Sequence, residues 1–128
     1  MSTKYKTYDI CIIDDNFEQA NILNVLIEYY GFKSTFFTNS ETAYQHISKS
    51  KPKLIILDLM MPDIDGLKLC RMIKQNPETA DVKVIIYSGK VFDVDRRRAM
   101  DLGADLFITK PARSKVLLDS IKSLMNQN

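Results

Sequence analysis

The sequence predicts an α/β domain built on a doubly wound parallel sheet. Two observations predict this class: short apolar runs rich in β-branched residues recur along the chain, and helical segments separate them. The four clearest runs cover residues 10–13, 54–57, 84–87 and 106–108. Continuous runs of about four such residues are typical of parallel strands buried on both faces. Strands and helices alternate five times, which favours a single sheet with right-handed crossovers.

The first five elements are predicted to be strand 8–13, helix 16–30, strand 33–38, a helix from 39 or 40 to 48, and strand 54–57. Apolar residues recur at helical spacing in the first helix, at Ala20, Leu23, Leu26 or Ile27, and Tyr30. Gly31 suits the end of that helix. Strand 33–38 mixes polar and apolar residues, as an edge strand would, and Asn39 or Ser40 is the expected N-cap of the second helix.

The second half is predicted to contain helix 66–77, strand 82–87, helix 91–102, strand 106–108 and helix 114–125. Pro77 cannot continue the third helix, and Gly103 is expected to terminate the fourth. The fourth helix has the poorest amphipathic pattern, and its plausible core contacts are Val94, Ala99 and Leu102. The last helix is expected to face inward through Leu117, Ile121 and Leu124.

The composition is that of one globular domain. The chain has 128 residues, of which 45% are hydrophobic and 27% charged, close to the average for folded proteins. No apolar stretch approaches the ~18 residues that span a bilayer, and residues 1–8 are interpreted as a polar tail rather than a signal peptide. We expect a single cytoplasmic domain over residues 1–128, without membrane association.

Several individual features have ordinary structural interpretations. Cys11 and Cys70 are too few for a disulfide scaffold and are expected in the core, and His46 is expected on a surface helix with no ligand motif near it. Residues 90–128 hold 8 Lys and Arg against 5 Asp and Glu, centred on the run 96–98. This run is either a solvated helix face or a docking surface for an acidic partner; no motif supports direct nucleic-acid binding.

Polar residues follow the apolar runs at the points where strands would emerge into loops. They are Asp14 and Asp15 after the first run, Asp58 after the second, Ser88 after the third and Lys110 after the fourth. The carboxyl ends of strands in an open α/β sheet form the usual site of chemistry. Carboxylates gathered there repel one another unless a cation is present, and Mg²⁺ is the hard ion that suits such oxygens. Singly, each aspartate is equally typical of a helix cap or turn.

A hydroxyl and an ammonium complete the predicted site. Ser88 can donate a hydrogen bond to a phosphoryl oxygen, and Lys110 can pair with another. Pro111 biases Lys110 away from helical angles and permits a cis peptide bond. The strand ends converge only if the first and third strands are neighbours.

These motifs, in this order, resemble those of the receiver domains of two-component response regulators, a chemotaxis-regulator-like family. The resemblance covers residues 9–125 and rests on Ile-Ile-Asp14-Asp15, Leu-Asp58-Leu-Met-Met-Pro62-Asp-Ile-Asp65-Gly66, Ile-Tyr-Ser88-Gly and Thr-Lys110-Pro111. It implies a flavodoxin-like (βα)5 fold with strand order 2-1-3-4-5.

The resemblance also implies a role for each site residue. Asp58 would accept a phosphoryl group from a sensor histidine kinase or a histidine phosphotransfer protein. Asp15, Asp58 and the carbonyl of Met60 would bind Mg²⁺ directly, and Asp14 would hold the ion through water. Ser88 and Lys110 would contact the phosphoryl oxygens.

A switch is implied as well. Ser88 would move toward the phosphoryl group, and Phe107 would rotate inward, although Phe107 is equally typical of plain core. The output surface would be formed by the fourth helix, fifth strand and fifth helix. It would contact a downstream protein target, and the domain would be a monomer or a phosphorylation-induced dimer.

The chain departs from the family pattern at three places. Ser88 replaces the commoner threonine and keeps the hydroxyl, whereas Ala112 stands where a bulkier residue often follows Lys-Pro, which predicts looser packing below Lys110. Met60 and Lys90 offer no carboxylate or amide to orient a hydrolytic water, which predicts a long-lived phosphoryl group.

Two other function classes remain open from the sequence. One is a Mg²⁺-dependent phosphatase with an aspartyl nucleophile, although such enzymes typically need a second aspartate where Met60 stands. The other is a degenerate receiver that acts only as a protein-interaction scaffold.

Overall fold

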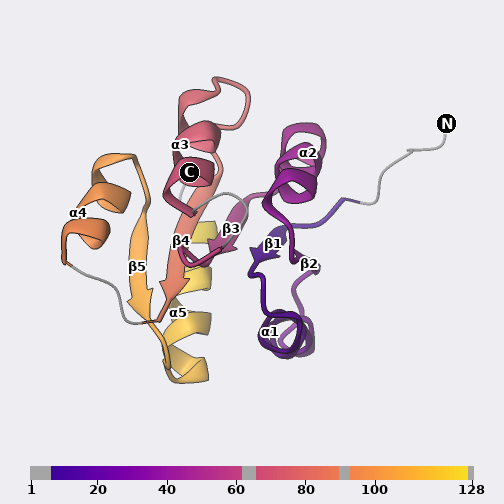
Figure 1. Ribbon diagram of the computed structural model, residues 1–128. Helices are drawn as coiled ribbons and strands as arrows, with labels where there is room; N and C mark the ends of the chain where they lie inside the picture. The colour runs from indigo at the N-terminus through magenta and orange to yellow at the C-terminus, as the bar shows by residue number, and fades with distance from the viewer. Residues whose placement is uncertain (1–6, 62–65, 90–92, 127–128) are drawn as a thin grey trace, which may run out of the picture.

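Five strands and five helices alternate along the chain, as Figure 1 shows. The computed structural model describes residues 7–61, 66–89 and 93–126. The elements are β1 (Ile10–Ile13), α1 (Phe17–Tyr29), β2 (Ser34–Phe37), α2 (Ser40–Ser50), β3 (Leu54–Leu57), α3 (Gly66–Gln75), β4 (Lys83–Ser88), α4 (Asp93–Asp101), β5 (Leu106–Thr109) and α5 (Ser114–Met125).

All five strands are parallel and lie in the order β2-β1-β3-β4-β5, which confirms the predicted topology. Ile13 at the end of β1 pairs with Leu57 at the end of β3, and Ser88 at the end of β4 pairs with Thr109 at the end of β5. The strands therefore finish along one edge, and the residues that follow them emerge side by side.

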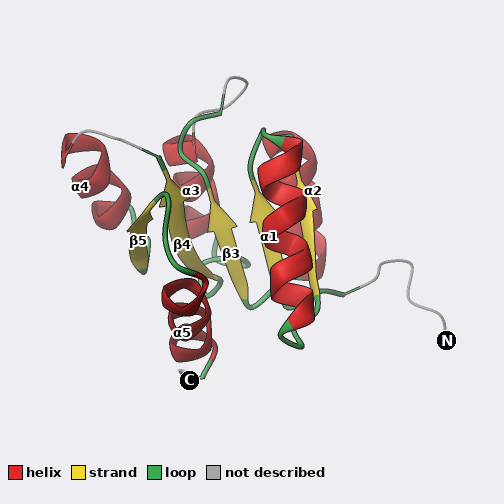
Figure 2. Cartoon of the chain, turned by 90° about the horizontal axis from the view of Figure 1, so that it is seen from below, coloured by secondary structure: helices red, strands yellow, loops and turns green. Residues whose placement is uncertain are grey.

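The helices form two layers around the sheet. Helices α1 and α5 cover one face, and α2, α3 and α4 cover the other (Figures 1 and 2). Successive strand residues point to opposite faces, so Cys11 and Ile13 pack under α2 and α3, whereas Ile10 and Ile12 pack under α1 and α5. The uninterrupted apolar runs reflect this burial on both sides.

The predicted elements are all present, with shifts at their ends. Strand β1 begins two residues later than predicted, α2 extends two residues further, and β4 and β5 each include one more residue at the carboxyl end. Asn39 is the N-cap of α2, since its side chain accepts from the Thr42 N–H. Gly31 and Gly103 follow α1 and α4 with positive φ, as expected for helix ends. The predicted start of the fourth helix, residue 91, lies outside the described residues.

Some predicted core contacts are wrong. Val94 on α4 is 53% exposed and Tyr30, just after α1, is 48% exposed, while Ala99 is the buried residue of α4. Leu102 packs only partly against the core. In α5 the prediction is confirmed for Leu117, Ile121 and Leu124, and Leu118 is buried as well.

The two cysteines are buried and free, as expected. Burial raises the pKa of the Cys11 thiol well above its ordinary value and raises the pKa of Cys70 to about 11. Both thiols are therefore protonated, unreactive parts of the core. Within the described residues, none of the helices has the length and apolar character needed to traverse a bilayer.

His46 on α2 is more enclosed than the sequence predicts. Its ring packs at centroid distances of 5.0 Å from Phe37 and 5.9 Å from Tyr8. Its Nε2 is buried without a hydrogen-bond partner among the described residues. Burial therefore lowers the pKa of His46, because the charged form is poorly solvated there.

A pH-dependent stability follows from His46. Between the lowered native pKa and the ordinary value of 6.5, the unfolded chain binds a proton that the native chain does not. The stability contributed by neutral His46 is therefore complete above pH 6.5 and is lost as the pH falls through that window. We expect thermal unfolding to show a larger loss of stability from pH 7.5 to 5.5 in the wild type than in His46→Gln. Equal losses in the two proteins would contradict this account.

Candidate functional site

The ammonium group of Lys110 lies between carboxylates that follow two neighbouring strands. Its Nζ donates to Asp14 Oδ2 at 2.7 Å and to Asp58 Oδ2 at 3.1 Å. It also donates to Gln19 Oε1 at 2.7 Å. The Lys110–Pro111 peptide bond is cis. Asp14 and Asp58 are only 6% and 8% exposed, so the cation meets them where water screens little.

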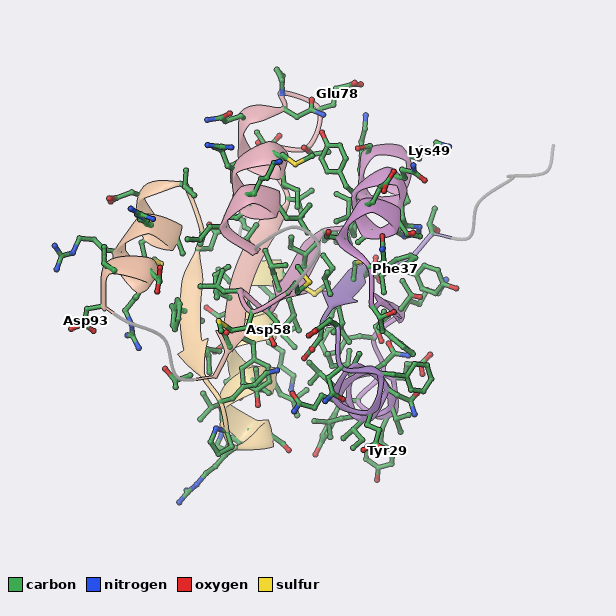
Figure 3. The ribbon with its side chains drawn as sticks, viewed as in Figure 1. Tyr29, Phe37, Lys49, Asp58, Glu78 and Asp93 are labelled. Atoms are coloured by element: carbon green, nitrogen blue, oxygen red, sulfur yellow. The ribbon has the colours of Figure 1, made fainter. Side chains whose placement is uncertain are left out.

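Asp58 is the most constrained carboxylate of this edge. Its Oδ1 accepts the hydroxyl of Ser88 at 2.7 Å and the backbone N–H of Met60 at 2.9 Å. Its own backbone N–H continues the sheet ladder to Ile13 O at 3.0 Å. Asp58 lies near the centre of the view in Figure 3, whereas Asp93 and Tyr29 lie at the periphery. The side chain is thus held at both oxygens by groups from other strands and loops.

Asp14 is placed by the same means on the neighbouring strand end. Its backbone N–H donates to Phe37 O at 3.1 Å, and its Oδ1 accepts from the Asn16 N–H at 2.9 Å. Asn16 in turn caps α1, since its side chain accepts from the Gln19 N–H. The start of α1 therefore holds the Asp14 carboxylate in place through the Asn16 N–H and places Gln19 within hydrogen-bond distance of Lys110.

Three carboxylates converge in the site. Asp14, Asp15 and Asp58 each offer an oxygen, and these atoms lie within 4.8 Å of one another. Desolvation raises the pKa of Asp15, and the charges of Asp14 and Asp58 raise it further. Burial alone would lower the pKa of Lys110, but its hydrogen bonds and charge interactions with Asp14 and Asp58 outweigh burial and raise it. One ammonium among the described residues thus faces three acidic groups.

The acidic groups suit a hard divalent cation. The donors are all oxygens, they are close enough to share one ion, and Asp15 is destabilised in its charged form by its neighbours. A second positive charge would relieve the repulsion that Lys110 leaves uncompensated. The cluster therefore has the donor chemistry of a magnesium site.

The backbone around Asp58 is in close contact with the start of α3. A Cβ atom added to Gly66 would lie 2.5 Å from Asp58 O and 2.5 Å from Leu59 Cα. Real Cβ atoms essentially never have non-bonded neighbours at such distances, so glycine is the residue that allows α3 to approach this closely. Residues 62–65 of the predicted loop, including Pro62 and Asp65, lie outside the described residues.

Phe107 on β5 lies half-buried at the neighbouring face. The guanidinium of Arg96 on α4 stacks over its ring at 4.6 Å from the centroid, and Arg96 Nη2 donates to Thr109 Oγ1 at 3.1 Å. Thr109 is the strand partner of Ser88. Phe107 and Ser88 therefore lie on adjacent strands, and Arg96 connects β5 to α4 through its contacts with Phe107 and Thr109.

A groove runs between α1 and α5 beside Lys110. It has a volume of about 420 Å³, and Ala112 is one of its lining residues. Its other lining residues are Asp14, Gln19, Ile22, Leu23, Leu26, Tyr87, Lys110, Pro111, Ser114 and Leu117. The Nζ of Lys110 lies over the Tyr87 ring, 5.3 Å from the ring centroid.

The sequence predicted the five charged or hydroxyl residues of the site, and the structure brings all five together. It did not predict Gln19, Tyr87 or Arg96. The spacing of Asn16 and Gln19 is that of a capping box, which was a usable sign that Gln19 lies at the start of α1. Lys90, invoked for phosphoryl lifetime, lies outside the described residues.

A (βα)5 fold with an acidic cluster, a hydroxyl and a lysine at the carboxyl edge defines a phosphoacceptor signalling domain. The model of the response regulator receiver domain matches residues 10–122, and the chain belongs to this family. It is a phosphoacceptor receiver of two-component signalling rather than a classical enzyme.

Individual relatives support the same family. The phosphate regulon transcriptional regulatory protein PhoB of Pseudomonas aeruginosa is 30% identical over 118 residues, which are 92% of this chain and 52% of PhoB. The transcriptional regulatory protein CssR of Bacillus subtilis is 34% identical over 119 residues, 93% of this chain and 52% of CssR. The chain thus spans about half the length of these regulators.

Among solved structures, the signal receiver domain of a DNA-binding response regulator from Colwellia psychrerythraea 34H superposes with a TM-score of 0.86. The two chains are 34% identical, and the match covers 94% of this chain and 99% of the other.

Proposed function

We propose that Asp58 is the phosphoacceptor and that Ser88 and Lys110 position and neutralise the incoming phosphoryl group. One observation carries this assignment: of the carboxylates that the structure describes, only that of Asp58 accepts hydrogen bonds from both the Ser88 hydroxyl and the Lys110 ammonium. A phosphoryl group joined to this carboxylate would extend its oxygens into the reach of both donors, which are then matched to its developing charge.

The reaction is a direct displacement at phosphorus. A carboxylate oxygen of Asp58 forms a bond to phosphorus while the P–N bond of a donor phosphohistidine breaks, and the electron pair returns to the imidazole nitrogen. With acetyl phosphate as donor, the P–O bond to the acetyl group breaks and acetate leaves. Lys110 keeps its proton throughout, because its carboxylate partners raise its pKa.

We propose Mg²⁺ as the cofactor, held by Asp15, Asp58 and the Met60 carbonyl, with Asp14 acting through water. The three converging carboxylates support this choice. The ion would supply positive charge to the phosphoryl oxygens, while this chain's own donors orient Asp58.

We propose a sensor histidine kinase or a histidine phosphotransfer protein as donor and the cytoplasm as the location, as for the receivers of such kinases. The exposed apolar side of α1 supports a donor docking beside the site. Phe17, Ile22 and Val25 are 62%, 67% and 57% exposed, and Ile22 lines the groove that reaches Lys110. A helical donor could therefore bury apolar surface here.

We propose that phosphorylation changes the surface formed by α4, β5 and α5. When the Ser88 hydroxyl turns to a phosphoryl oxygen, the space beside β5 changes, and an inward rotation of Phe107 would alter its stacking with Arg96. The output is then a changed contact with a downstream protein. The receiver would be one domain over residues 1–128, acting as a monomer or as a phosphorylation-induced dimer. The domain itself would not bind nucleic acid directly.

Mass spectrometry tests the phosphoacceptor. Wild-type protein incubated with acetyl phosphate and Mg²⁺ should gain one phosphate, and Asp58→Asn should gain none. Asp15→Asn should stay unmodified at the Mg²⁺ concentration that suffices for the wild type. A phosphate retained in Asp58→Asn would refute the assignment.

The phosphoryl group should persist for minutes or longer. Met60 is 63% exposed and carries no carboxylate or amide to orient an attacking water, so hydrolysis lacks assistance there. Loss of phosphate should be followed after removal of acetyl phosphate, with Met60→Glu expected to accelerate it severalfold. Complete loss within seconds from the wild type would disprove the prediction.

A further inference from the structure

A second groove lies between α3 and α4, the two helices at the upper left of Figure 1. It has a volume of about 420 Å³, within the range of pockets that bind small ligands or side chains. It is lined by Leu67, Lys68 and Arg71 of α3, by Arg98 and Asp101 of α4, and by Leu102 just after α4. None of these residues contacts the phosphoacceptor cluster in the described interactions.

The arginine run on α4 is divided between two surfaces. Successive helical residues point about 100° apart, so Arg96 turns to Phe107 and Thr109, whereas Arg98 lines the α3–α4 groove. Arg97 belongs to neither group of contacts. All three arginines are exposed, as a solvated helix face requires, but their side chains do not share one set of neighbours.

The groove combines two exposed arginines with an apolar lining. Among the described residues, Arg71 and Arg98 have no hydrogen bond or ion pair, although both are exposed beside one cavity. Leu67 and Leu102 are half-buried between them. Lys68 adds a third positive charge to the lining, and Asp101 is its one acidic member. The surface is therefore complementary to an anionic group with an adjoining apolar one.

We propose that the α3–α4 groove binds an acidic, amphipathic segment of a partner protein. Carboxylates of the segment would pair with Arg71 and Arg98, each able to bind a carboxylate in bidentate fashion. An aliphatic side chain of the same segment would pack on Leu67 and Leu102. This surface is separate from the α4–β5–α5 output surface, because Arg98 and Arg96 leave α4 in different directions.

Two other polyanions suit the groove less well. A nucleic-acid backbone requires cations repeated along its length, but Asp101 interrupts this patch, and Asp93 and Asp95 occupy the first turn of α4. A membrane surface would require protruding apolar side chains, whereas Leu67 and Leu102 are half-buried. A short acidic segment avoids both conflicts.

The test uses the unphosphorylated chain, so its result does not depend on the assignment of Asp58. Isotope-labelled protein is titrated with a synthetic peptide that carries Leu at helical spacing on one face and Glu on the remaining positions, and its NMR spectra are recorded. The amide resonances of α3 and α4 are expected to shift. Arg71→Glu and Arg98→Glu should each weaken binding by about tenfold, as expected for loss of an attractive pair and gain of a repulsive one.

Arg97→Glu is the matched control, because it makes the same charge change on the same helix outside the groove. It should retain binding within about twofold, and each variant's thermal unfolding should match the wild type. The proposal is overturned if the peptide shifts no α3 or α4 resonance, or if Arg97→Glu weakens binding as much as Arg98→Glu. It is also overturned if a DNA duplex or anionic lipid vesicles bind these residues more tightly than the peptide.

Discussion

Replacement of Lys110 by methionine should slow phosphorylation by acetyl phosphate by about 100-fold or more. Methionine retains much of the apolar stem but removes the ammonium that bonds to Asp58 Oδ2 at 3.1 Å. Removal of one charged or polar donor from a transition-state site costs about 10²–10³ in rate. The rate is measured as the appearance of phosphorylated protein in mass spectra over time.

A second readout separates loss of chemistry from loss of the site. Without Lys110, the carboxylates of Asp14 and Asp58 have no paired cation among the described residues, so Mg²⁺ should still bind and should raise the melting temperature more than it does in the wild type. Lys115→Met, which removes an exposed ion pair with Asp119, should leave both measurements unchanged. A normal phosphorylation rate in Lys110→Met would remove this residue from the proposed mechanism.

Replacement of Gly66 by alanine should destabilise the fold by about 2 kcal/mol or more, as expected for overpacking against atoms that cannot yield. In an ordinary helix this change would stabilise by roughly 0.5–1 kcal/mol. Here the new Cβ would lie 2.5 Å from Asp58 O and from Leu59 Cα, both backbone atoms. Urea denaturation should show the lower midpoint, and phosphorylation should slow because the backbone of Asp58 must move.

Gly89→Ala provides the matched control beside the same site. A Cβ added there has no neighbour within 4 Å in the part of the chain that the structure describes, so the change in stability should stay within about 0.5 kcal/mol. If Gly66→Ala is as stable as the wild type, the close approach of α3 to Asp58 is not required for the fold.

The sequence was most informative where burial is two-sided. The runs that became β1, β3 and β4 are uninterrupted because helices cover both faces of the sheet, and the residues after them had to emerge at one edge. The strand ends were less certain. Ser88, predicted to follow a strand, is its last residue, because it still pairs with Thr109.

Helical spacing failed where apolar residues are few. In α4 it assigned Val94 to the core, yet Val94 is exposed and only Ala99 is buried. With so few apolar residues, the pattern cannot determine which side of the helix faces inward. Gln19 was missed for another reason: its bond to Lys110 joins residues 91 positions apart, and no local pattern reports such a contact.

Lys110 is already saturated before any phosphate arrives. An ammonium has three N–H groups, and here they serve Asp14, Asp58 and Gln19. A phosphoryl oxygen that binds the Lys110 ammonium must replace one of these three acceptors. Gln19 is the one expected to be replaced, because its amide is uncharged and exposed. Gln19 lies on α1, so its displacement would change the surface of the helix on which the phosphate donor is proposed to dock. Phosphorylation would thereby lower the affinity of the domain for its phosphate donor.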